Sequence, residues 1–162
     1  IPTVLNLLAG KYIFALILFA IASVSDAVDG FLARFFKWQT DLGKILDPVA
    51  DKLLMIGSIT ALWLNQIVPL SVFVIFVFRD LLILLGAAFE MSITEKTPSP
   101  NLIGKITTTS QIIYILVLII FEILNVDINV QIFHILIGFI SLLSLMSYFR
   151  WWLNNNFIKQ NV

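Results

Sequence analysis

The sequence predicts an all-α integral membrane protein, a transmembrane helical bundle with five readable spans. Hydrophobic residues make up 60% of the 162 residues, charged residues make up 12%, and the mean hydropathy is +1.02. Soluble domains are about 45–50% apolar and about 25% charged. The apolar residues also gather into runs of the length, about 20 residues, that a helix needs to cross a bilayer. Composition and run length therefore agree on the fold class.

The predicted spans follow one another through short polar connections. They cover residues 11–36, 42–64, 69–92, 102–124 and 130–153. Pro69 suits the first turn of the third span, and residues 95–101 form a longer polar loop. The first ten residues are too short to span, so they either lie along the membrane interface or begin a further span. Ile1 opens an apolar stretch without basic residues, so no cleavable signal peptide is expected.

Basic residues predict the orientation of the spans. With five antiparallel spans, only Lys11 falls on one side of the membrane. The opposite side collects Arg34, Lys37, Lys44, Lys96, Lys105, Arg150 and Lys159. Lys and Arg are enriched on the cytoplasmic side, so that side is predicted to be cytoplasmic. The expected location is the bacterial inner membrane, with the mitochondrial inner membrane as the alternative.

Charge and residue usage exclude several classes of function. The formal net charge is zero, so there is no basic face for a nucleic acid. The chain has no cysteine, which removes disulfide and thiolate chemistry. The single histidine, His134, lies near the non-cytoplasmic side, so a zinc site is not expected.

Four carboxylates lie close together in the first third of the chain: Asp26, Asp29, Asp47 and Asp51. On helices, the first two are i,i+3 neighbours and the last two are i,i+4 neighbours, so each pair projects from one face. A charge at bilayer depth costs several kcal/mol or more. Four such charges need a compensating partner, and carboxylate oxygens suit Mg2+, Mn2+ or Ca2+. The spacing therefore predicts a divalent-metal site at the cytoplasmic side.

Small residues and one cation accompany these acids. Gly30 and Ala33 remove side-chain bulk, and Arg34 supplies a cation suited to phosphate. Together with metal-binding acids, they describe a site for a metal and a diphosphate. The alternative is that the acids only form ion pairs at an interface, with Lys37, Lys44 and Lys52.

The complete pattern is D-x2-D-G-x2-A-R-x8-G-x3-D-x3-D, running from Asp26 to Asp51. It is similar to the signature of the CDP-alcohol phosphotransferase family. The stretch LGKILDPVADK, residues 42–52, resembles the subgroup that makes anionic phospholipids. That subgroup contains the phosphatidylglycerophosphate synthases and the cardiolipin synthases that use CDP-diacylglycerol. The resemblance extends over about residues 21–148.

The resemblance implies an architecture and a reaction. Residues 1–162 would form a single transmembrane domain with its active site at the cytoplasmic side. Family members have six transmembrane helices and often form homodimers. They transfer a phosphatidyl group from CDP-diacylglycerol to an alcohol and release CMP. Only five spans are readable here. Pro2 and Asn6 match the Pro and Asn that the family's first span usually carries.

The resemblance also implies roles for the motif residues. Asp26, Asp29 and Asp47 would bind metal. Asp51 would approach the metal and act as the general base. The cofactor would be Mg2+ or Mn2+, with two ions expected. The residues expected around CDP-diacylglycerol are Asp26, Asp29, Gly30, Ala33, Arg34 and Gly43.

Arg79 and Lys105 are the predicted acceptor-binding residues. Arg79 lies deep in its span beside Asp80, and intramembrane charges are functional by default. The alternative readings are a self-contained ion pair for Arg79 and a snorkelling side chain for Lys105.

The surroundings of these residues bear on the choice of acceptor. Phosphatidylglycerophosphate synthases usually have further basic residues where this chain has Ala87 and Thr107. A dianionic acceptor needs several cations. The preferred acceptor is therefore phosphatidylglycerol, as in cardiolipin synthases, and glycerol 3-phosphate is the alternative.

Two other classes of function remain open. A cation transporter would use the acids as ion sites, but such sites usually lie near the midplane on broken helices. A non-catalytic scaffold would have no need of all four acids.

Overall fold

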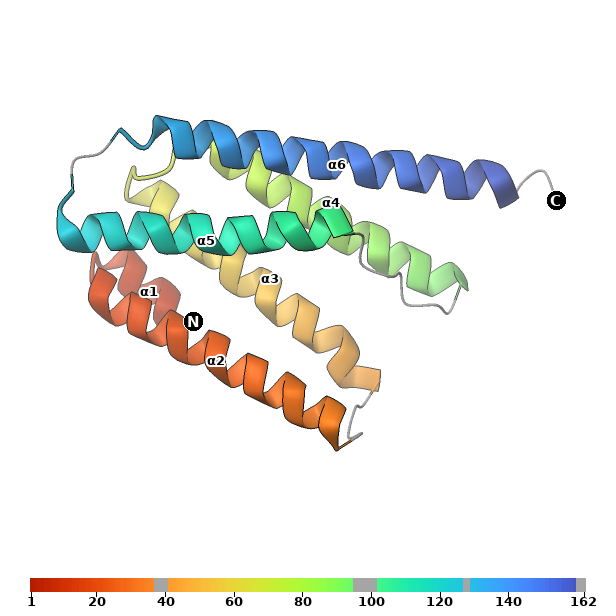
Figure 1. Ribbon diagram of the computed structural model, residues 1–162, viewed down its shortest axis with the longest axis horizontal. Helices are drawn as coiled ribbons and strands as arrows, with labels where there is room; N and C mark the ends of the chain where they lie inside the picture. Colours follow the sequence, from red (N-terminus) through yellow and green to blue (C-terminus); the bar gives the residue numbers. More distant parts are fainter. Residues whose placement is uncertain (37–40, 95–101, 127–128, 160–162) are drawn as a thin grey trace. The chain divides into compact units, whose positions relative to one another are not determined.

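The computed structural model shows an all-helical chain in the residues that it describes (Figure 1). The helices are α1 (Pro2–Leu8), α2 (Tyr12–Phe35), α3 (Asp41–Leu64), α4 (Leu70–Thr94), α5 (Leu102–Leu124) and α6 (Gln131–Lys159). The described backbone comprises residues 1–36, 41–94, 102–126 and 129–159. Side chains are described there except at residues 23, 26–27, 29–31, 33–34, 41–48, 87–94, 102 and 151–159.

Each predicted span coincides with one long helix. α6 continues to Lys159, beyond the predicted end at residue 153, because no glycine or proline interrupts the chain there. Pro69 precedes α4 rather than lying in its first turn, and its carbonyl accepts a hydrogen bond from the Phe73 amide at 3.1 Å. The first ten residues contain α1, with Pro2 at its beginning.

Two of the described helical stretches are long and apolar enough to cross a membrane. They are Ile103–Leu124 and Gln131–Arg150, with mean hydropathies of 1.9 and 2.0. Tyr12–Ala22 is a shorter apolar stretch. α6 also presents large apolar side chains outward, including Ile135 and Met146, which are 70% and 69% exposed. Apolar exposure of this extent along a helix is typical of a surface that meets lipid or another protein. The count of five spans stays a prediction.

The helices form two compact units. Unit 1 comprises Ile1–Val68 and Ile115–Ile128, and unit 2 comprises Pro69–Tyr114 and Asn129–Val162. α5 begins in unit 2 and ends in unit 1.

In unit 1, α1 contacts both α2 and α3. Its Leu7 is completely buried, and the Leu7 carbonyl accepts a hydrogen bond of 2.7 Å from the Asn65 side chain at the end of α3. Val4 lies against Gly57 of α3 so closely that a Cβ at Gly57 would be 2.8 Å from Val4 Cγ2. The missing side chain at Gly57 is therefore what lets α1 approach α3.

Three helix ends in unit 1 use the same left-handed turn. Gly10, Gln66 and Asn125 have φ values of +68°, +62° and +48°. At each position, the amide of this residue donates a hydrogen bond to the carbonyl three residues earlier. The amide of the following residue donates to the carbonyl five residues before it, and the two bonds together form a Schellman motif. Glycine and asparagine tolerate this conformation, whereas Gln66 adopts it at a cost of about 1–2 kcal/mol.

In unit 2, α4 and α6 lie side by side (Figure 1). Gly86 permits their close approach, because a Cβ there would overlap the Tyr148 hydroxyl. The buried faces of these helices are not wholly apolar: they include Arg79, Asp80, Ser141 and Ser144.

Candidate functional site

The four motif acids lie on α2 and α3, both of which belong to unit 1. The backbone is helical at all four positions. The i,i+3 and i,i+4 spacings therefore place Asp26 with Asp29 on one face of α2, and Asp47 with Asp51 on one face of α3. α2 ends at Phe35 and α3 begins at Asp41, so the halves that carry the acids adjoin each other in the sequence (Figure 1).

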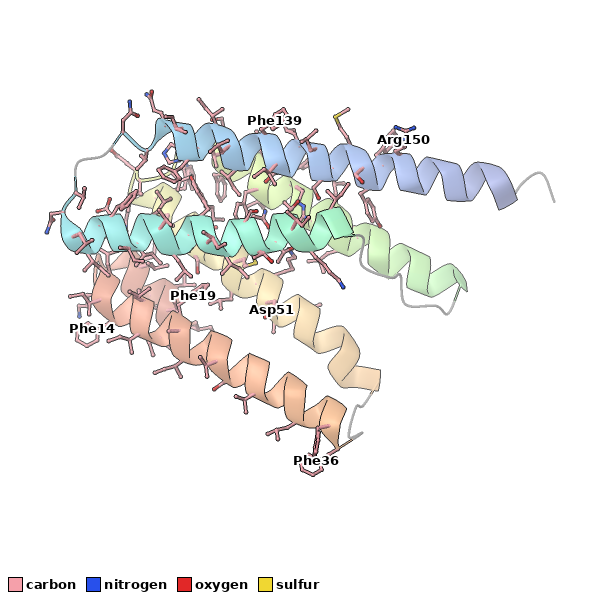
Figure 2. The ribbon with its side chains drawn as sticks, viewed as in Figure 1. Phe14, Phe19, Phe36, Asp51, Phe139 and Arg150 are labelled. Carbon is pink, nitrogen blue, oxygen red and sulfur yellow. The ribbon has the colours of Figure 1, made fainter. Side chains whose placement is uncertain are left out.

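Among these acids, Asp51 has a described side chain. It is exposed and lies part-way along α3 (Figure 2). The side chains of Asp26, Asp29 and Asp47 lie outside the described residues, as do those of Gly30, Ala33, Arg34 and Gly43. Within the described part of the chain, no three His, Cys, Asp or Glu side chains gather into a metal centre. The donor set itself, carboxylates at helical spacing, fits a hard divalent cation.

An apolar groove lies between α1 and α3 in unit 1. Its volume is about 280 Å³, and its lining consists of Ile1, Val4, Leu5, Ala50, Leu53 and Leu54. Ala50, Leu53 and Leu54 are the near neighbours of Asp51 on α3. The side chains that line the groove are all apolar.

The predicted acceptor residue Arg79 is buried in unit 2, where it is 2% exposed. Its Nη1 donates to Asp80 Oδ1 at 2.6 Å, and Asp80 is fully buried. Its Nη2 donates to Ser144 Oγ of α6 at 2.9 Å and, at 3.5 Å, to the Gly104 carbonyl of α5. The guanidinium therefore joins three helices, and its charge is neutralised by the next residue in the chain.

Lys105, the second predicted acceptor residue, is exposed at the beginning of α5. It follows Gly104, whose carbonyl accepts the hydrogen bond from Arg79. The structure therefore brings the α4 cation to the turn of α5 that carries Lys105.

The family model described as CDP-alcohol phosphatidyltransferase matches residues 1–153. The chain belongs to this family.

Several curated relatives are similar to this chain. A Bacillus subtilis (strain 168) protein named CDP-diacylglycerol--glycerol-3-phosphate 3-phosphatidyltransferase is 37% identical over 97 residues, which cover 60% of this chain and 50% of the relative. An Aquifex aeolicus (strain VF5) protein of the same name is 35% identical over 101 residues, covering 60% of this chain and 56% of the relative. A Streptomyces coelicolor protein named Cardiolipin synthase (CMP-forming) is 32% identical over 95 residues, covering 59% of this chain and 44% of the relative.

The chain spans about half the length of these relatives. Family membership confirms the resemblance read from the Asp motif. The relatives carry the names of both expected activities, one using glycerol 3-phosphate and one making cardiolipin.

Two polar residues of this family member, Ser141 and Tyr114, escaped the sequence reasoning. Ser141 is buried, as is Gln111, and Tyr114 shares a hydrogen bond of 2.6 Å with His134. A signal was present: Thr107 and Gln111 are i,i+4 neighbours on α5, and two serines of α6 are three residues apart. Polar residues repeating at helical spacing within apolar helices indicate a shared inward face.

Proposed function

We propose that the protein is a CDP-diacylglycerol-dependent phosphatidyltransferase of the cytoplasmic membrane face. It transfers the phosphatidyl group of CDP-diacylglycerol to an alcohol and releases CMP, a step in anionic phospholipid synthesis. The observation that carries the proposal is the complete Asp motif on the helical α2 and α3 of a chain whose residues 1–153 match the family. A homodimer in the bacterial inner membrane is the form proposed to act.

The motif residues have separate tasks in this proposal. Asp26, Asp29, Asp47 and Asp51 hold the metal, which is Mg2+ or Mn2+ with two ions expected. When bound, the ions supply charge neutralisation at the diphosphate. Arg34 adds a cation at the diphosphate. The small residues Gly30, Ala33 and Gly43 leave room for the nucleotide.

Asp51 is proposed as the general base. The acceptor hydroxyl oxygen forms a bond to the lipid-linked phosphorus, and its proton passes to the Asp51 carboxylate. The bond between that phosphorus and the CMP oxygen breaks, and CMP leaves with the electron pair. The exposed position of Asp51 on α3 supports this role, because a base must reach its substrate.

The preferred acceptor is proposed to be phosphatidylglycerol. Asp80 neutralises Arg79 at 2.6 Å, so the pair offers an acceptor little net positive charge. This suits the singly charged phosphodiester of phosphatidylglycerol better than the nearly dianionic phosphate of glycerol 3-phosphate. The names of the Bacillus and Aquifex relatives make glycerol 3-phosphate the alternative. Arg79 and Lys105 are the proposed acceptor-binding residues in either case.

The test is CMP release by the purified protein in detergent or vesicles, with labelled CDP-diacylglycerol and Mn2+ or Mg2+. We expect release with phosphatidylglycerol, loss of release with a chelator, and a decrease of at least about 100-fold in kcat for Asp51→Asn. Asp41→Asn, which changes an acid of α3 outside the motif, should retain activity.

Two outcomes would count against the proposal. If neither acceptor supports metal-dependent release of CMP, the phosphatidyltransferase activity is rejected. A higher kcat/KM for glycerol 3-phosphate than for phosphatidylglycerol would reject the preferred acceptor only.

A further inference from the structure

A pocket of about 240 Å³ lies at one end of unit 1, where the chain passes from α1 to α2 and where α5 ends. Its lining consists of Gly10, Lys11, Tyr12, Ile13, Phe14 and Ile123, all of which belong to unit 1. The motif acids of α2 lie towards the other end of that helix. Asp26 follows Lys11 by 15 residues, which corresponds to about 20 Å of helix. The pocket is therefore separate from the Asp motif.

Hydrogen bonds hold the backbone of the segment that carries Lys11. Gly10 turns the chain with a φ of +68°, and its amide donates to the Leu7 carbonyl at 3.0 Å. The Lys11 amide donates to the Asn6 carbonyl at 2.8 Å. The Asn65 side chain of α3 also donates to the Leu7 carbonyl, at 2.7 Å. This part of the pocket is thus positioned before a ligand arrives, which lowers the entropic cost of binding.

Two opposite charges flank the pocket. Lys11 lines it and is exposed. Glu122 is half-buried on α5 and directly precedes the lining residue Ile123. Glu122 also lies within electrostatic range of the hydroxyl of Tyr12, another lining residue. The pocket therefore has a cation on its α2 side and a carboxylate on its α5 side.

These two charges are not paired within the part of the chain that the structure describes. Neither Lys11 nor Glu122 forms a salt bridge with a described residue, in contrast to Arg79 and Asp80. Both side chains are accessible, so a ligand can reach both. A charge-assisted hydrogen bond is about twice as strong as a neutral one. The pocket thus offers one such bond to an anionic group and a second one to a cationic group.

Large apolar side chains continue from the pocket along the outside of α2. Ile13 and Phe14 are 58% and 63% exposed, and Figure 2 shows Phe14 projecting outward from the helix. Ile17 lies one turn further along and is 51% exposed. A lipid fits this arrangement, because its phosphate can meet the lysine while its acyl chains cover the apolar side chains.

The two charges specify the headgroup of that lipid. A phosphodiester suits Lys11, and an ammonium with N–H donors suits the Glu122 carboxylate. Phosphatidylethanolamine has both groups. Phosphatidylglycerol has no ammonium and would leave Glu122 without a partner. Phosphatidylcholine has a quaternary ammonium, which has no N–H to donate.

We propose that this pocket binds a phospholipid with a primary ammonium headgroup, with its phosphate at Lys11 and its ammonium at Glu122. The acyl chains lie along Ile13 and Phe14. The bound lipid joins the beginning of α2 to the end of α5 and so stabilises this end of unit 1. The site takes no residue from the Asp motif, so it does not depend on the proposed transferase function.

Thermal denaturation in lipid nanodiscs tests the proposal. The unmodified protein is placed in phosphatidylcholine alone, in phosphatidylcholine with phosphatidylethanolamine, and in phosphatidylcholine with phosphatidylglycerol. A ligand that binds the folded protein raises the melting temperature. We expect phosphatidylethanolamine to raise it by a few degrees above phosphatidylcholine alone, and phosphatidylglycerol to raise it less. Equal melting temperatures in the three compositions would overturn the proposal.

Variants of the two charged residues locate the effect. Lys11→Gln and Glu122→Gln should each abolish the increase that phosphatidylethanolamine causes. Each variant is compared with itself in phosphatidylcholine, so that any effect of the substitution on folding cancels. Arg150→Gln is the control, because it removes an exposed cation of α6 that does not line the pocket. This variant should keep the full increase.

Two further outcomes would contradict the proposal. An increase that persists in both Lys11→Gln and Glu122→Gln would place the lipid elsewhere on the protein. If phosphatidylglycerol stabilises as strongly as phosphatidylethanolamine, and only Lys11→Gln removes the effect, the pocket recognises a phosphate alone. The assigned contact between the ammonium and Glu122 is then wrong.

Discussion

Arg79 and Asp80 are the charged residues that the described part of the chain buries, at 2% and 0% exposure. A buried ion pair offers little net stability, because both charges lose their water. Removing one partner is far more costly, since the other charge remains buried alone. The pair is therefore better explained by what it joins, three helices of unit 2, than by its own contribution to stability.

We expect Asp80→Ala to destabilise the protein by about 3–5 kcal/mol, because Arg79 loses its counter-charge. The double variant Arg79→Met, Asp80→Leu should recover most of that loss, since it leaves no buried charge. Thermal denaturation in detergent measures both effects. The double variant also tests the proposed acceptor role of Arg79. A stable double variant with an unchanged acceptor KM would assign the pair to helix packing alone.

At the scale of elements, the docking of α1 on α3 depends on one absent side chain. Gly57→Ala would place a Cβ 2.8 Å from Val4 Cγ2. We expect a loss of about 1–3 kcal/mol from this overpacking, measured as a lower melting temperature. Val4→Ala in the same chain should recover part of the loss. Gly138→Ala, whose Cβ meets nothing within 4 Å, is the control and should be neutral or slightly stabilising. Equal effects of the two glycine variants would contradict this account of α1.

The long helices could be predicted from the sequence, and α1 could not. The apolar run at residues 102–124 predicted a span with the same bounds as α5, Leu102–Leu124, because length and hydropathy alone define such a span. α1 has only seven residues, too few to be a stable helix in isolation. Its contacts with α2 and α3, and the hydrogen bond from Asn65 to Leu7, support it, and none of these is visible in a local pattern.

The candidate site divides in the same way. The Asp motif was recognisable because helical spacing alone brings Asp47 and Asp51 to one face. The roles of the motif acids stay predictions. The polar residues that repeat at helical spacing on α5 and α6 indicate which face of each helix turns inward. Which neighbouring helices those faces meet was not recognisable, because the pattern within one helix carries no information about its partners.

At the scale of the whole molecule, the predicted topology places the ends of α3 and α5 on the side opposite the Asp motif. The chain has no cysteine, so single-cysteine variants report position without background. We expect Arg150→Cys to react with a membrane-impermeant maleimide only from the cytoplasmic side, and Gln66→Cys and Asn125→Cys only from the opposite side. All three native residues are exposed. Labelling of all three from one side would reject five alternating spans.

The adjacency of Arg79 and Asp80 has a consequence for biogenesis. When a buried ion pair joins two helices, each charge lacks its partner until the second helix is in place. Here both charges belong to neighbouring residues of α4, and they meet at 2.6 Å within that one helix. A segment that enters a bilayer with its charges already cancelled avoids much of the several kcal/mol that a lone Arg or Asp costs at the bilayer centre. In the predicted topology, in which α4 spans the bilayer, this pairing would let α4 enter before α5 and α6 are synthesised. Ser144 and Gly104 would then complete the contacts of Arg79.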